Sequence, residues 1–251
     1  MSRNFASSEV KGLDEVLGEI PVGWYHVMLV TMAGLAYACD SMVANVVGFS
    51  SKCAGDEFSL TPEQVGHVPT ALFSGAIFGA IFFGQFADLF GRRPAMLLSI
   101  EVIMGGFVLT AIVQSYTFLV IGWLGIGFGA GGTGIAFDYI TEVMGSSTNG
   151  AGFQVQCFWP LATTLVGLLA WLILGYGGSW RILIGSLCIP AGAVWTMLYL
   201  YLPESARWHL DKKNYEEAEK MVRTYAKING TQLEPFTLSR GILNESGDAS
   251  N

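Results

Sequence analysis

Residues 84–93 read GQFADLFGRR and connect two apolar segments, Val65–Ala87 and Ala95–Ser115. Each segment has the length of about 20 residues that an α-helix needs to cross roughly 30 Å of hydrocarbon. The connection carries Asp88 and two adjacent arginines, which belong in water or in a charge-paired site rather than in lipid. This pattern predicts two antiparallel membrane helices joined by a charged turn at one membrane face.

The composition of the whole chain extends this prediction. Only 13% of its 251 residues are charged, whereas soluble domains carry about 25%, and the mean hydropathy is +0.48. We therefore predict an all-α membrane protein with six transmembrane helices in one bundle, residues 24–202. The four further spans are Trp24–Gly48, Thr117–Tyr139, Gly152–Tyr176 and Ile182–Leu202.

The positions of lysine and arginine predict the orientation. If the N-terminus lies in the cytoplasm, eleven of the 13 basic residues fall on the cytoplasmic side, and only Lys52 and Arg181 fall outside. The positive-inside rule then places both termini in the cytoplasm. Residues 1–23 are expected to form a cytoplasmic N-terminal segment, and residues 203–251 a cytoplasmic helix and tail. Asn214–Ile228 has the apolar spacing of an amphipathic helix.

Several segments carry predictions about the helices and loops. Ser50–Gln64 is polar and is expected to form an outer loop. The glycine-rich residues 125–134, and the pair Gly75 and Gly79, are interpreted as sites of close helix packing. A formal dinucleotide-binding pattern within 125–134 is discounted, because it lies inside a membrane span. Kinks are expected at the prolines of three spans, namely Pro69, Pro160 and Pro190.

The connection between the second and third spans carries the strongest chemical signal. Gly84 and Gly91 are expected to allow a close helix approach and a tight turn. Asp88 is expected to form charge-assisted hydrogen bonds with Arg92 and Arg93, in a latch that breaks and re-forms when helix bundles rock. The alternative is that the two arginines only anchor the loop in the cytoplasm. The Gly-Asp-Gly-Arg-Arg spacing favours the latch.

Two motifs resemble those of major facilitator superfamily (MFS) transporters. Residues 84–93 resemble the motif G-x-x-x-D-x-x-G-R-R/K between spans two and three of these proteins. Pro203-Glu-Ser-Ala-Arg-Trp208 resembles the P-E-S-x-R-W/Y motif of the sugar-porter, organic-ion and synaptic-vesicle-protein branches. The resemblance covers nearly the whole chain and implies the N-terminal six-span half of such a transporter. It also implies gating roles for Glu142, Glu204 and Arg207, together with the loop residues.

Three acidic residues are candidates for binding substrate or protons, namely Asp40, Glu101 and Asp138. Asp40 lies well inside the first span, where an unpaired carboxylate costs at least about 2.5–3.5 kcal/mol. It is therefore expected to face an aqueous cavity or a partner, as a protonation site or as the counter-charge of a cationic substrate. The alternative for Asp40 is a structural hydrogen bond to a neighbouring helix. For Glu101 and Asp138 a structural role is equally open.

The chain departs from the family pattern at three positions. Val43 stands where this branch often carries glutamate, three residues after the acidic residue of span one. Asn149 and Ile121 stand where family members carry arginine. These departures put the substrate site, the gating and the proton coupling in question.

The function expected from the resemblance is that of half a membrane transporter for a small organic ion, completed by a second six-span half or a homodimer partner. The alternative is a non-transporting, MFS-derived subunit of a larger membrane complex. The expected partners are membrane lipid and these other subunits, not nucleic acid. No nucleophile elbow, metal-ligand cluster or phosphate loop is recognisable in the sequence, so no enzyme activity, metal or cofactor is expected. The sequons at Asn229 and Asn244 are interpreted as chance matches.

Overall fold

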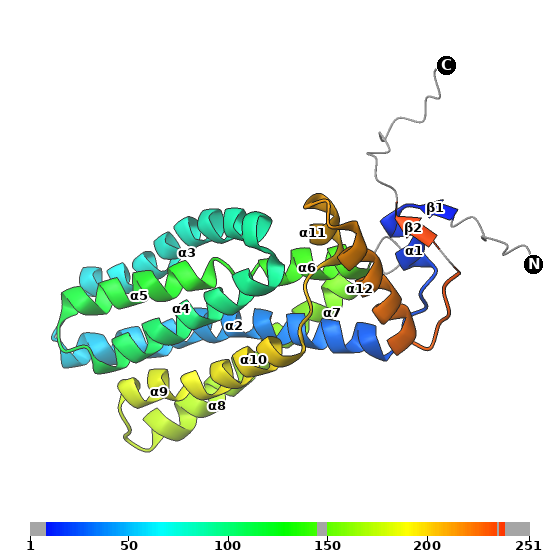
Figure 1. Ribbon diagram of the computed structural model, residues 1–251. Coiled ribbons are helices and arrows are strands. Elements are labelled where there is room, and N and C mark those ends of the chain that lie inside the picture. The colour runs from blue at the N-terminus through cyan, green and yellow to red at the C-terminus, as the bar shows by residue number, and fades with distance from the viewer. Residues whose placement is uncertain (1–8, 145–149, 235, 239–251) are drawn as a thin grey trace, which may run out of the picture.

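The computed structural model describes residues 9–144, 150–234 and 236–238. Within them, six helical segments are long and apolar enough to span a membrane, which confirms the predicted fold class. They lie along one another in an elongated bundle (Figure 1). The segments are α2 (Trp24–Glu57), α3 (Pro62–Phe90), α4 (Arg92–Ile112), α5 (Tyr116–Ala130) with α6 (Ile135–Met144), α7 (Ala151–Gln156) with α8 (Phe158–Gly175), and α9 (Trp180–Ser186) with α10 (Cys188–Tyr201).

Shorter elements gather at the end of the bundle that carries the connection between α3 and α4 (Figure 1). We call this the motif end. The first strand, β1, pairs in parallel with the last, β2, and this short ladder was not predicted from the sequence. The elements are β1 (Glu9–Lys11), α1 (Leu13–Gly18), α11 (Ala206–Asp211), α12 (Tyr215–Ile228) and β2 (Phe236–Leu238).

The expected outer loop Ser50–Gln64 is largely wrong. Helix α2 continues to Glu57, and α3 begins at Pro62, so only residues 58–61 are non-helical. The start of α3 is fixed by a capping box, in which the Gln64 N–H donates to Thr61 Oγ1 (3.3 Å) and the Thr61 N–H donates to Gln64 Oε1 (2.9 Å). Such a box satisfies two backbone donors that would otherwise lack partners. Polar composition therefore marked helix ends here rather than a long loop.

Three of the six spans are interrupted. The fourth span leaves the α-helical form at residues 131–134. Its backbone hydrogen bonds there join residues three apart, such as Thr133 N to Ala130 O (3.1 Å). The fifth and sixth are interrupted at Cys157 and Leu187, each three residues before a predicted kink proline. A proline lacks the N–H that its helix position needs, so the preceding turn is disturbed. Helix α3 is continuous through Pro69, so the kink expected there stays a prediction.

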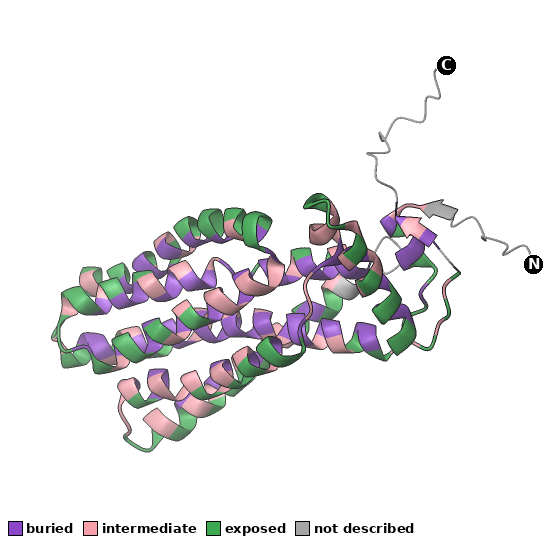
Figure 2. Cartoon of the chain, viewed as in Figure 1, coloured by how far each residue is buried: buried purple, intermediate pink, exposed green. Residues whose placement is uncertain are grey.

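Glycines allow α3 and α5 to lie in direct backbone contact, as predicted from the small-residue pattern. A side chain at Gly79 would collide with the Phe128 backbone, and one at Gly127 would collide with the Leu72 backbone. Membrane helices lack a strong hydrophobic driving force toward each other, so close van der Waals contact is a main source of their association. The opposite side of α3 is exposed (Figure 2). Gly84 lies on that side, and a side chain there would meet no described atom within 4 Å apart from the backbone of its own helix.

The motif end is held together by segments from both ends of the chain. Helix α12 lies within the segment predicted as an amphipathic helix, and it buries Ala218, Val222 and Tyr225 against the same core as Leu13 and Val16 of the N-terminal segment. After α12, Gly230 adopts φ +75°, as expected for a helix-ending glycine. The N-terminal and C-terminal segments thus form one packed unit.

Asn229 connects this unit to the first span. Its Oδ1 accepts the Tyr25 N–H (3.0 Å) at the start of α2, and its Nδ2 donates to Pro21 O (3.2 Å) and lies 2.8 Å from His26 Nδ1. An N-terminal helix N–H has no partner in its own helix, so this side chain supplies one from a segment 204 residues away. Asn229 therefore has a structural role. Asn244, the other sequon, lies outside the described residues.

We expect Asn229→Ala to lower the thermal stability of the detergent-solubilised protein, because lost helix caps typically cost about 1 kcal/mol. The matched control is Asn214→Ala at the start of α12, where the side chain makes no capping hydrogen bond. A melting temperature that falls equally in both variants would contradict the assigned role of Asn229.

Candidate functional site

Asp40 lies on α2 beside the interruption of the fourth span. Its carboxylate interacts with the Thr133 hydroxyl, which belongs to the non-helical residues between α5 and α6. Asp40 also borders a small cavity of about 30 Å³, together with Val43, Leu72 and Ala130. A cavity of this size is enough for about one water molecule. Asp40 thus has both a polar partner and adjacent space, as the cost of burying a carboxylate requires.

An aromatic cluster lies on the motif-end side of Asp40. Tyr37, one helical turn before Asp40 and in electrostatic contact with it, packs edge-on against Phe137 of α6 at 4.9 Å between ring centroids. The Trp159 ring of α8 lies 5.3 Å from Tyr37. Three spans therefore bring half-buried rings together around Tyr37, the ring next to the Asp40 carboxylate. Aromatic faces attract cations, so this arrangement favours a ligand with a cationic group.

A second polar cluster was missed by the sequence analysis. On α2, Ser41 Oγ donates to Trp159 O (2.9 Å) and lies 3.0 Å from Thr163 Oγ1. Asn45, one turn further, donates to Ser41 O (2.7 Å) and Thr163 Oγ1 (3.1 Å). Such hydrogen bonds hold membrane helices together. The sequence signal was that Ser41 and Asn45 lie four residues apart, and so on one face of α2. The sequence did not show that Thr163 of α8 packs against that face.

Glu101 lies apart from Asp40, on the outer side of the contact between α4 and α10. Its exposed carboxylate accepts the Trp195 Nε1–H (3.0 Å). Trp195 in turn stacks on Tyr199 with an interplanar angle of 6°. The structure therefore places Glu101 neither in the cavity beside Asp40 nor among the charges of the motif end, which were the two locations considered from the sequence.

Asp138 and Glu142 lie at the motif end, one turn apart on α6. Asp138 is exposed and in electrostatic contact with Arg92, Asp88 and Glu142. Glu142 is bonded directly: Arg92 Nε and Nη2 lie 3.0 Å and 2.9 Å from its Oε1. Arg92 Nη1 also lies 2.6 Å from Asp88 Oδ1. Arg92 therefore bridges the end of α3 and the end of α6, whereas the Arg93 side chain bonds to Tyr199 O and not to Asp88, and the opening of this latch stays a prediction.

Glu204 binds the start of α4. Its Oε1 accepts the backbone N–H groups of Arg92 (2.8 Å), Arg93 (3.3 Å) and Ser205 (3.0 Å). Burial raises the pKa of the Glu204 carboxyl, and these N–H groups oppose that rise. Gly91 adopts φ +112°, and a side chain there would collide with the Glu204 carboxylate. Gly91 is thus required both for its backbone conformation and for this contact.

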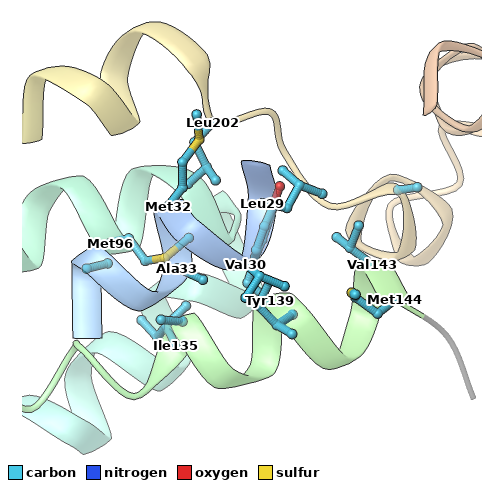
Figure 3. Close-up of a cluster of buried hydrophobic side chains, with 14 of the residues drawn as sticks. Leu29, Val30, Met32, Ala33, Met96, Ile135, Tyr139, Val143, Met144 and Leu202 are labelled. Carbon is cyan, nitrogen blue, oxygen red and sulfur yellow. The ribbon is translucent and has the colours of Figure 1, made fainter. Parts of the chain in front are cut away.

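Further contacts attach the second motif, residues 203–208, and the second loop arginine to the bundle. Arg93 Nη2 donates to Tyr199 O (2.6 Å), and Arg207 pairs with Asp14 of the N-terminal segment. Tyr139 of α6 is fully buried and donates its hydroxyl to Pro203 O (3.1 Å). Figure 3 shows Tyr139 beside Val30 of α2, in the apolar cluster that supports this end. The two motifs therefore form one network across α3, α4, α6 and α10.

A second charge cluster, also missed by the sequence analysis, lies at the opposite end of the bundle. Arg181 pairs with Glu57 at the end of α2 and donates to Val113 O (2.9 Å) after α4. Trp180 Nε1 also donates to Glu57 Oε2 (2.7 Å). The only sequence signal was that Arg181 is a rare basic residue on the predicted outer side. It ties spans one and three to span six.

Comparisons with known proteins point to the same transporter family as the two sequence motifs. Residues 25–238 match the model of the family described as "Sugar (and other) transporter". The chain is 25% identical over 240 residues to the Arabidopsis thaliana organic cation/carnitine transporter 7, covering 95% of this chain and 48% of that protein. It is 26% identical to mouse synaptic vesicle glycoprotein 2C, covering 90% of this chain and 33% of that protein. The chain thus spans about half the length, or less, of these curated relatives.

Solved structures share the fold. The MFS proton:xylose symporter XylE superposes with a TM-score of 0.73 at 22% identity, over 80% of this chain and 50% of that one. A partially occluded, inward-open structure of the xylose transporter XylE from E. coli gives a TM-score of 0.71 at 21% identity, over 80% and 55%. At this identity the likeness shows the fold alone. With the family match and both motifs in place, the chain belongs to the sugar (and other) transporter family of the major facilitator superfamily, and corresponds to its N-terminal six-helix half.

Proposed function

We propose that this chain forms the N-terminal half of a transporter that moves a small organic solute with a cationic group by alternating access. The observation that carries the proposal is the position of Asp40. Its carboxylate lies on the first membrane-spanning helix, beside the interrupted fourth span and next to Tyr37, whose ring packs against Phe137 and Trp159. Transporters bind substrate near the middle of the bilayer, at helices that are interrupted. A carboxylate with aromatic faces suits an ammonium group.

A second six-helix half would complete the site. The exposed side of α3 supports this part of the proposal, because Ile77, Ile81, Gly84 and Asp88 follow one another at helical spacing along it. The stripe is apolar within the span and ends in the charged turn. A second bundle packed there would fill the space in which a side chain at Gly84 would meet nothing from the other described helices.

The network around Arg92 and Glu204 is proposed to act as the inner gate. Alternating access moves two bundles against each other around a fixed site. Asp88 has a side chain that is 70% exposed at the edge of the network, so it is available to a helix of the second half, whereas Glu142 is enclosed. The gate lies in the cytoplasm under the orientation that the positive-inside rule gives. Asn149, one of the departures from the family pattern, lies outside the described residues.

The proposal is tested by reconstituting the chain with its second half in liposomes and measuring uptake of three solutes: tetraethylammonium, succinate and xylose. We expect saturable uptake of the cation, with the other two near background. Imposing a pH gradient tests proton coupling through Asp40, which predicts faster uptake when the gradient drives protons in the same direction. Background uptake of all three, with stable co-purification of other membrane proteins, would instead favour a non-transporting subunit.

A further inference from the structure

A groove lies between α12 and the motif ends of α2 and α10. Figure 1 shows the positions of these three helices. Its volume is about 260 Å³. The residues that line it from α12 lie at helical spacing, so that they form one stripe of that helix. The groove is lined by Tyr25 and Met28 of α2, Tyr201 at the end of α10, and Met221, Tyr225 and Ile228 of α12.

The groove continues into the surface that faces lipid. Tyr201 is 61% exposed, and the preceding Leu200 is 62% exposed, on a helix long and apolar enough to span the membrane. Ile228, on the α12 side, is 48% exposed. Large apolar side chains at the end of a span, next to an amphipathic helix, are placed where acyl chains meet headgroups. An acyl chain can therefore enter the groove without leaving the hydrocarbon layer.

The charged residues that line the groove are Lys220 and Glu217 of α12. The side chain of Lys220 is 72% exposed, whereas Arg223 and Lys227 are exposed on the same helix but do not line the groove. Lys220 lies 3.3 Å from Glu217, but an ammonium has three N–H donors, so donors remain for another oxygen. Basic residues on the polar face of an interfacial helix attract anionic lipid.

We propose that this groove binds one anionic glycerophospholipid, with an acyl chain against Tyr201 and Ile228 and the phosphate at Lys220. Bound there, the lipid contacts α2, α10 and α12 together. It therefore fastens the packed unit of the motif end to the membrane surface beside the network of Glu204 and Arg92. The leaflet involved rests on the orientation in the proposed function, whereas binding itself does not.

Native mass spectrometry of the full chain, delipidated in detergent, tests this. Phosphatidylglycerol, phosphatidylcholine and glycerol 3-phosphate are the probes. We expect one tightly retained phosphatidylglycerol, weaker retention of phosphatidylcholine and no binding of glycerol 3-phosphate. Ile228→Asp should remove lipid retention. Lys220→Gln should reduce the preference for phosphatidylglycerol over phosphatidylcholine about fivefold, the effect of one basic residue near an anionic surface.

The matched control is Lys213→Gln, an exposed lysine in the turn before α12 that does not line the groove. It should leave the preference unchanged. Equal retention of the two lipids by the wild-type chain, or unchanged retention in Ile228→Asp, would overturn the proposal. So would weakened association of Ile228→Asp with the second half without any change in lipid binding, because the groove would then be a protein interface. None of these results depends on transport, so the proposed function stands or fails separately.

Discussion

Substituting Asp40 with asparagine is expected to reduce cation uptake by the reconstituted transporter about 10–100-fold, because hydrogen bonds to charged groups are worth about 1.5–3 kcal/mol and each 1.4 kcal/mol is tenfold. Asparagine keeps the size of the side chain and can still bond the Thr133 hydroxyl, so the fold should persist. The loss should therefore appear in initial uptake rates and in cation affinity, at unchanged protein levels.

Glu101→Gln is the matched control, because it also neutralises a carboxylate within a span. Glu101 accepts the Trp195 Nε1–H on the outer side of α4 and α10, and glutamine can accept the same bond. We expect near-normal uptake. Equal uptake by the wild type and Asp40→Asn would refute the assigned role of Asp40. Equal losses in both variants would point to a general effect of charge on stability.

The second large effect is expected at Arg92, whose removal leaves an enclosed carboxylate without its partner. The side chains of Arg92 and Glu142 are 18% and 14% exposed, and the second oxygen of Glu142 has no hydrogen-bond partner in the described structure. We expect Arg92→Met to destabilise the protein by about 2–4 kcal/mol, somewhat less than for a fully buried pair. The measurement is unfolding in detergent, followed by near-ultraviolet circular dichroism.

Two further variants make this test specific. Glu142→Met added to Arg92→Met should restore most of the stability, because an apolar pair of similar volume carries no uncompensated charge. Asp88→Asn should cost no more than about 1 kcal/mol, because its ion pair with Arg92 is exposed on the Asp88 side. If Asp88→Asn proved as costly as Arg92→Met, or the double variant were no more stable than the single one, the enclosed Arg92–Glu142 pair would not be the stabilising contact.

Local sequence information was sufficient for the spans and for the motif at residues 84–93. Hydrocarbon thickness fixes the length of a membrane helix, and each backbone polar group must be satisfied within the segment, so apolar length alone predicts helices. Even so, the end of α2 was placed too early, because a polar helix end continues beyond the hydrocarbon as far as Glu57. The contact of Arg92 with Glu142 was expected only through family resemblance, since the two residues lie 50 positions apart.

The same chain segment, GQFADLFGRR, shows what the sequence determined and what it did not. Its position between two apolar segments, with Asp88 and Arg92 four residues apart, determined the turn and the nearer ion pair. Only the tertiary structure decided that Gly91 lies against Glu204, that Asn229 caps α2, and that Glu101 is separated from Asp40. The physical reason is that local periodicity fixes which face of a helix is apolar, whereas the partner of a polar side chain depends on which distant segment packs beside it.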